Sequence, residues 1–292
     1  MVNSEGTKNK GFQESPSGFR KNPLEFQKKT DYDINDFKKL MQLLCGPDGC
    51  PWDREQTHES IKRNLLEEAY ETAEAIDNND TQGLIEELGD VLMQVIFHSN
   101  IAEKAGTFDL DVISDTACKK LIRRHPHVFG EICAKDGNES IAFWEDIKRK
   151  EKLHESTFEA MQSVARNLPE LWRAEKIQKK AAKAGFDWPT YEGAFEALKS
   201  EIAELEEAIK ADNDFTDKPS EIQAEIGDLL FSIVNVARFF DIDPENALKA
   251  TNEKFISRFT KMELEIKAQG KEFKNMTLDE METVYQQVKL EK

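Results

Sequence analysis

Two pairs of carboxylates are the residues of this sequence most suggestive of chemistry. Glu68 and Glu71 lie three residues apart, and so do Glu87 and Asp90. Residues at this spacing share one face of an α-helix, so each pair would present its two carboxylates together. An apolar stripe beginning at Leu88 flanks the second pair. We therefore expect the four acids at or near a seam between helices rather than plainly facing solvent.

Four clustered carboxylates repel one another, and a dry seam would raise their pKa values. A hard dication relieves this repulsion, and Mg²⁺ prefers oxygen ligands while keeping positions open for water and substrate phosphates. The pattern predicts a Mg²⁺ site, with Mn²⁺ as a possible substitute. The alternative is an acidic helix face that is simply solvated. A glycine follows Glu87 by two residues, at a helical cost of about 1 kcal/mol relative to Ala, and a close approach between helices would explain it.

The whole acidic pattern occurs a second time. Its second copy consists of Glu201, Glu204, Glu225 and Asp228, with Gly227 at the position of Gly89. Glu201 follows Glu68 by 133 residues, and Asp228 follows Asp90 by 138. Neighbouring strings recur in the same order, which indicates two homologous modules, 31–155 and 156–292. The segment 1–30 is rich in Gly, Ser, Asn, Lys and Pro, which is typical of a flexible tail.

Both modules have helical periodicity, and the fold class predicted is all-α. In the first module we expect helices over 37–45, 60–77 and 81–106, with Thr81 as N-cap, then one that Pro126 ends and a short one with Trp144. The second module repeats this order. The runs 91–101 and 229–240 are apolar nearly all round, so we expect both to be buried. Four or five helices around an apolar centre make a bundle module.

Cationic and aromatic residues that recur in register are candidates for substrate binding. Lys120 and Arg124 are four residues apart, as are Lys254 and Arg258, and each pair suits a clamp on the β- and γ-phosphates or an exposed cationic face. Weaker candidates of the same type are Lys148 and Lys289. The aromatic candidates, which either stack on a base or belong to the core, are Trp52, Trp144, Trp188 and Tyr285.

Composition excludes several other functions. Lys plus Arg number 40 and Asp plus Glu 57, and a net charge of −17 argues against nucleic-acid binding through a general positive field. No run of about 18 uncharged apolar residues exists, so we expect no membrane span. The four cysteines are too sparse for a disulfide scaffold, and free thiols in a reducing cytoplasm are expected. Walker and G-x-G-x-x-G loops are missing from the sequence.

The acidic strings resemble one protein family. Glu67-Glu68-x-x-Glu71 followed by Glu87-x-x-Asp90 is similar to the motif of the MazG family of all-α nucleoside triphosphate pyrophosphohydrolases. Further strings resemble its tandem two-domain members, namely Cys50-Pro-Trp-Asp53, Leu66-Glu-Glu-Ala-Tyr70, Arg123-Arg-His-Pro-His-Val-Phe129 and Gly185-Phe-Asp-Trp188. The resemblance covers residues 36–292. It implies two tandem four-helix modules and Mg²⁺-dependent hydrolysis of NTPs or dNTPs to the monophosphate and pyrophosphate. It also implies a homodimer or higher oligomer.

The second module departs from the motif at one position. Ser200 stands where the first module has Glu67, so we favour Glu68 and Glu201 as ligands because both modules keep them. Two other functions compete with this one. A carboxylate-bridged iron bundle needs two E-x-x-H pairs, and only Glu55-x-x-His58 exists. A helical interaction protein with decayed sites is the second, and two intact acidic patterns speak against it.

Overall fold

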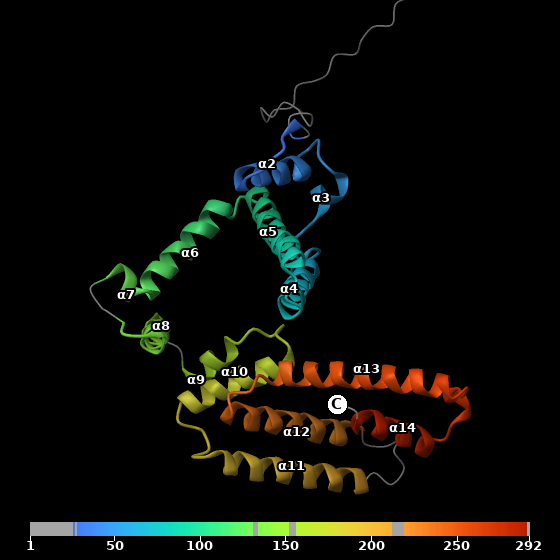
Figure 1. The fold of residues 1–292 in the computed structure, drawn as a ribbon. Coiled ribbons are helices and arrows are strands. Elements are labelled where there is room, and N and C mark those ends of the chain that lie inside the picture. The colour runs from blue at the N-terminus through green and yellow to red at the C-terminus, as the bar shows by residue number, and fades with distance from the viewer. Residues whose placement is uncertain (1–25, 27, 131–133, 152–155, 212–218, 291–292) are drawn as a thin grey trace, which may run out of the picture. The chain divides into compact units, whose positions relative to one another are not determined.

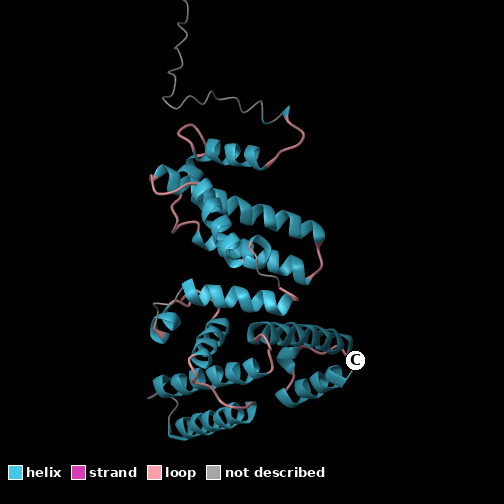
Figure 2. Cartoon of the chain, turned by 90° about the vertical axis from the view of Figure 1, so that its left-hand side faces the viewer, coloured by secondary structure: helices cyan, strands magenta, loops and turns pink. Residues whose placement is uncertain are grey.

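The computed structural model describes residues 26, 28–130, 134–151, 156–211 and 219–290, and every regular element in these ranges is a helix (Figures 1 and 2). The prediction of an all-α fold is confirmed. The chain forms two compact units, 1–150 and 151–292. Most of the tail expected over 1–30 lies outside the described residues.

The first unit is built on a helical hairpin. Its helices are α2 (Ile34–Cys45), α3 (Pro51–Glu55), α4 (Lys62–Asp77), α5 (Thr81–Lys104), α6 (Leu110–Arg124), α7 (Pro126–Phe129) and α8 (Gly137–Glu151). Helices α4 and α5 pack along one another, and α2 lies against α5. The core joins α2 to α5 through Met41, Cys45, Ile96 and Phe97. The hairpin is the element that positions the first group of acids.

Local signals explain where these helices begin and end. Asp33 accepts hydrogen bonds from the first turn of α2 in a capping box with Asp36. Asp80 caps α5 by accepting from the backbone of Gln82 and Gly83. The prediction of Thr81 as this N-cap was wrong by one residue, because the Asp80 side chain already satisfies the free N–H groups. Gly106 follows α5 with φ +70, the left-handed conformation that favours glycine after a helix.

The second unit repeats this plan. Its helices are α9 (Thr157–Gln162), α10 (Glu170–Lys183), α11 (Tyr191–Ala211), α12 (Pro219–Phe239), α13 (Pro244–Ala268) and α14 (Leu278–Leu290). Helices α11 and α12 form the hairpin equivalent to α4–α5, and α10 packs on α12 as α2 does on α5. A separate core joins α13 to α14 through Met262, Ile266, Val284 and Val288.

Two expectations about packing are wrong for the contacts made within one chain. The apolar runs are not buried all round, since Leu92 is 38% exposed and Leu230 and Ile233 are 46% and 44% exposed. Each hairpin covers only one side of these helices. The glycines of the acidic motifs do not mark a close approach between helices either. A Cβ added at Gly89 or Gly227 would meet nothing within 4 Å.

Two further expectations concern the cysteines and membranes. Cys45, Cys50 and Cys118 are free thiols, as predicted, and Cys133 lies outside the described residues. Among the described helices, none combines the length and the apolar character needed to cross a bilayer.

Candidate metal site

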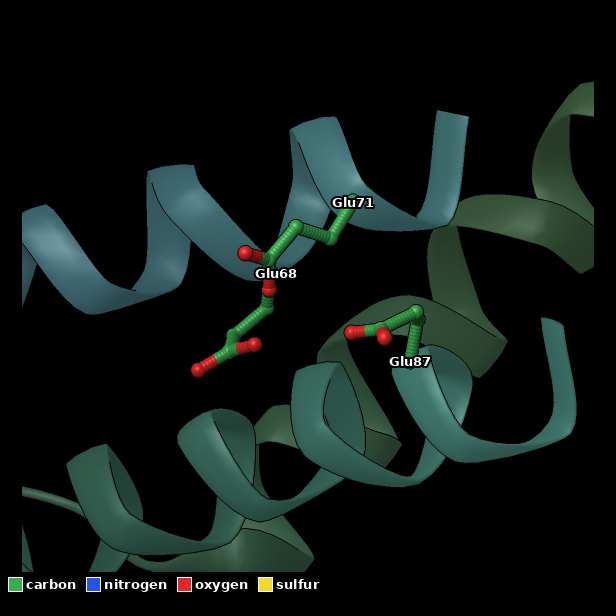
Figure 3. A group of neighbouring side chains, drawn as sticks. All are labelled: Glu68, Glu71 and Glu87. Carbon is green, nitrogen blue, oxygen red and sulfur yellow. The ribbon is translucent and has the colours of Figure 1, made fainter. Parts of the chain in front are cut away.

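The structure brings three acids of each motif together. Glu68 and Glu71 on α4 face Glu87 on α5, and each contributes one carboxylate oxygen to a group in which all oxygens lie within 4.8 Å of one another (Figure 3). The second hairpin repeats this group with Glu201 and Glu204 on α11 and Glu225 on α12, within the same limit. We call these groups the first and second acidic clusters.

The fourth acid of each motif stands beside its cluster. Asp90 lies almost one turn after Glu87 on α5, and Asp228 has the same place on α12. Neither belongs to the group within 4.8 Å. Asp90 is nevertheless near enough to raise the pKa of Glu68, and Asp228 raises the pKa of Glu201. The two aspartates therefore lie beside the clusters, close enough to interact electrostatically with their acids.

Burial and mutual repulsion raise the pKa values of carboxyls in both clusters. Burial is the largest cause raising the pKa of Glu68, followed by the charges of Asp90 and Glu71. Burial, then Glu71 and Asp90, likewise raise the pKa of Glu87. In the second cluster the pKa of Glu201 is raised by burial, and then by Glu204, Asp228 and Glu225. A bound cation would reverse these shifts, because it stabilises the ionised carboxylates.

The position at which the modules differ has different surroundings in each. Glu67 points to solvent, where Arg63 Nε donates to its Oε1 at 2.7 Å. Ser200, at the equivalent position on α11, donates its hydroxyl to Glu204 Oε1 at 2.9 Å. Glu67 is thus not a member of the first cluster, whereas Ser200 contacts the second.

The candidate phosphate clamps stand on α6 and α13, outside the hairpins that carry the clusters. Arg124 lies over the Trp144 ring, with Cζ 5.1 Å from its centroid, and Lys120 is exposed. Both stand on α6, which diverges from the α4–α5 hairpin towards its carboxyl end (Figure 1). Lys254 and Arg258 stand on α13, which packs against α10 and α14.

The aromatic candidates have mixed surroundings. Tyr285 packs against the α13–α14 core and lies 5.9 Å from Phe255 between ring centroids, which favours a packing role. Trp188 is 46% exposed, while Trp52 is 57% exposed and contacts Phe97 edge-on. Lys289 is exposed, and the side chain of Lys148 lies outside the described part of the structure.

Sequence reasoning missed three side-chain contacts in the two modules. Arg238 donates to both carboxylate oxygens of Asp187, which anchors the loop that carries Trp188. The ring nitrogens His58 Nδ1 and His98 Nδ1 lie 2.8 Å apart, in stacked rings. The third is the Ser200–Glu204 hydrogen bond. The first two join segments 51 and 40 residues apart, so local periodicity carries no signal for them.

The surroundings of His58 bear on the iron-bundle alternative. The Glu55-x-x-His58 pair is not part of a metal group, and in the described ranges the two groups able to hold a cation consist of carboxylates alone. Oxygen-only donor sets favour Mg²⁺, Ca²⁺ or Mn²⁺ over softer metals.

Comparisons with known proteins agree with this duplicated architecture. The model of the MazG nucleotide pyrophosphohydrolase domain matches residues 56–129 and 190–262, and each match contains one acidic cluster. The nucleoside triphosphate pyrophosphohydrolase/pyrophosphatase MazG of Thermotoga maritima is 42% identical over 86% of this chain and 93% of its own length. The nucleoside triphosphate pyrophosphohydrolase of Escherichia coli (strain K12) is 42% identical over 86% of this chain and 94% of its own.

A third relative is longer than this chain. YabN of Bacillus subtilis, which is uncharacterized, is 42% identical over 91% of this chain but only 54% of its own length.

The chain belongs to the MazG nucleotide pyrophosphohydrolase family, a family of hydrolases.

Proposed function

We propose that this protein hydrolyses nucleoside triphosphates, NTPs or dNTPs, to the nucleoside monophosphate and pyrophosphate. The observation that carries the proposal is the duplicated cluster of three carboxylates, one in each segment that matches the family model. Two relatives that match this chain over nearly their whole length are named for this activity. The reaction is attack of a water on the α-phosphorus.

The acidic clusters suit Mg²⁺, which prefers oxygen ligands. In the first module the ligands proposed are Glu68, Glu71, Glu87 and Asp90, and in the second Glu201, Glu204, Glu225 and Asp228. When bound, the metal supplies a lowered pKa for the attacking water and charge compensation for the departing pyrophosphate. One glutamate of each cluster serves as general base. Mn²⁺, with similar ligand preferences, is expected to substitute.

The cationic helices neutralise the leaving group in this proposal. Lys120 and Arg124, or Lys254 and Arg258, contact the β- and γ-phosphates. Since α6 diverges from its hairpin, the first pair reaches the triphosphate only if α6 moves or if a second copy of the chain supplies the residues.

A homodimer, or a higher oligomer, is the second part of the proposal. The hairpins leave large apolar side chains in water, among them Leu88, Leu92, Ile226 and Leu230, which are 38–51% exposed. They flank Gly89 and Gly227, where the space above the helix is open. A second copy packing on this surface would bury the stripe and explain why glycine occupies both positions.

The products of one reaction test the proposed activity. The full-length protein is incubated with ATP and Mg²⁺, and the mixture is resolved by anion exchange. AMP plus pyrophosphate is the expected outcome. Formation of ADP and phosphate, or no hydrolysis of any nucleotide in a panel of NTPs and dNTPs, would contradict it. Sedimentation velocity on the same sample tests the oligomer.

A further inference from the structure

The second acidic cluster contains a neutral hydrogen-bond donor. Ser200 and Glu204 are one helical turn apart on α11, and the serine hydroxyl donates to Glu204 Oε1 at 2.9 Å. Glu204 in turn provides one of the three oxygens of the cluster. The hydroxyl thus holds a carboxylate that is placed to bind a cation.

The first cluster holds the equivalent carboxylate differently. Glu71, which corresponds to Glu204, lies within 4.8 Å of the other acids of its own cluster, Glu68 and Glu87, measured between carboxylate oxygens. The residue equivalent to Ser200 is Glu67, which pairs with Arg63 in solvent. The two modules therefore have matching acids and different support for one of them.

We propose that Ser200 is a positioning residue for the metal ligand Glu204. The inference rests on the proposed function, because it assumes that the clusters bind a divalent cation. A hydroxyl on one oxygen restricts rotation of the carboxylate and leaves its second oxygen directed by that restraint. Residues that hydrogen-bond to metal ligands in this way typically change metal affinity by about 10–100-fold. Where the first module has the charged Glu67 outside its site, the second module thus has the hydroxyl donor Ser200, which orders a ligand of its site.

The test measures metal binding in the full-length chain without nucleotide. Glu71→Gln with Asp90→Asn disables the first cluster, and free Mn²⁺ is followed by electron paramagnetic resonance during titration. In this background Ser200→Ala is expected to weaken Mn²⁺ binding by about 10-fold or more. Ser200→Thr keeps a hydroxyl, and its Mn²⁺ affinity is expected to stay within about 3-fold of the parent, well short of the loss expected for Ser200→Ala. Melting curves without metal verify that each variant is folded.

The matched control is Glu67→Ala with the second cluster disabled by Glu204→Gln and Asp228→Asn. Its Mn²⁺ affinity should equal that of the same background with Glu67 intact. Equal affinities of Ser200→Ala and its parent, or a loss in Ser200→Thr as large as in Ser200→Ala, would overturn the positioning role alone. If the parent with Ser200 intact binds no Mn²⁺, the proposed metal site itself is overturned, and the product analysis with ATP then decides the proposed activity separately.

Discussion

The two modules keep the same acids at the middle of each hairpin and differ at its ends. Before α4, the backbone N–H of Glu59 and then Thr57 lower the pKa of the Glu59 carboxyl; at the start of α11, Thr190 and then the backbone N–H of Glu192 lower the pKa of the Glu192 carboxyl. The residue between them is His58 in one module and Tyr191 in the other. His58 stacks on His98, whereas Tyr191 lies 5.3 Å from Phe240 between ring centroids.

A second difference lies at the carboxyl ends of α5 and α12. Asn100 is buried in the first module, while its equivalent, Arg238, pairs with Asp187 in the second. A further contrast is in the cationic helices, because α6 ends at Arg124 before Pro126, and α13 continues to Ala268. If the acids share one cation, as proposed, their positions can vary little, whereas packing contacts can be replaced by others of similar volume. The comparison indicates that both copies kept the hairpin and its acids, whereas the contacts at the ends of the hairpin changed.

The largest expected effect is loss of turnover when the aspartates are replaced. Asp90→Asn with Asp228→Asn should reduce pyrophosphate release from ATP by about 100-fold or more, equivalent to at least about 2.7 kcal/mol of transition-state stabilisation. The single variants then rank the modules. We expect Asp228→Asn to cost more, because α13 carries Lys254 and Arg258 without a proline break. Steady-state rates of the full-length variants measure this, and wild-type activity in the double variant would exclude the clusters as the site.

Metal should stabilise both modules. A dication that binds only the folded clusters adds about 2.7 kcal/mol at 100 times its dissociation constant. Mg²⁺ or Mn²⁺ should therefore raise the melting temperature by about 5–10 °C, beyond NaCl of equal ionic strength. Glu204→Gln should leave the metal-free protein no less stable and shrink this rise. A metal-free variant much less stable than the parent, with its metal response intact, would instead make Glu204 part of a structural ion pair.

Alanine at the motif glycines should separate folding from assembly. Ala has a higher helix propensity than Gly by about 1 kcal/mol, and the added Cβ meets nothing within the chain. Gly89→Ala and Gly227→Ala should therefore each stabilise the monomer. The variant whose module packs against a second copy should also dimerise more weakly, and sedimentation equilibrium measures this. Unchanged association in both variants would place the interface elsewhere.

The raised pKa values predict an unusual pH dependence without metal. A carboxyl whose pKa is higher in the folded state binds more protons there, so its stabilising contribution is complete below the unfolded pKa near 4.3 and is lost as pH rises. Glu68→Gln should reduce this fall in unfolding free energy, and Glu201→Gln should do the same. The first module should show the larger slope, since the pKa of Glu87 is raised as well. Denaturant titrations at pH 4.5–7.5, with about 1 mM chelator, measure it; saturating Mg²⁺ should abolish the slope.

The smallest expected effect concerns the histidine pair. Burial, then the neighbouring His58, lowers the pKa of His98, so its contribution to stability is present above pH 6.5 and is lost as pH falls through the folded-state pKa. His98→Val, which copies Val236 at the equivalent position, should remove this acid-side loss. The difference between the variant and the parent isolates it from the carboxylates. Parallel pH profiles of unfolding free energy would show that the pair does not titrate in this range.

Periodicity and duplication were enough to predict the long helices of each module and the acids that its hairpin brings together, but not the short helices α3, α7 and α9. These signals are local: a helix repeats every 3.6 residues, and a carboxylate three residues from another shares its face whatever surrounds it. Even the preference for Glu68 over Glu67 followed from comparing two copies. The exact cap of α5 was misplaced by one residue because Asp80 and Thr81 are both good capping residues.

Contacts between distant segments were decided by the tertiary structure alone. Only the hairpins show that Glu87 meets Glu68 and Glu71 within 4.8 Å while Asp90 stands beside them. Only the packing shows that Leu92 and Leu230 remain exposed. Apolar periodicity reports that a face avoids water, but it does not report whether the same chain or another covers it. A sequence determines which groups share a helix face, and the crossing of helices determines which faces meet.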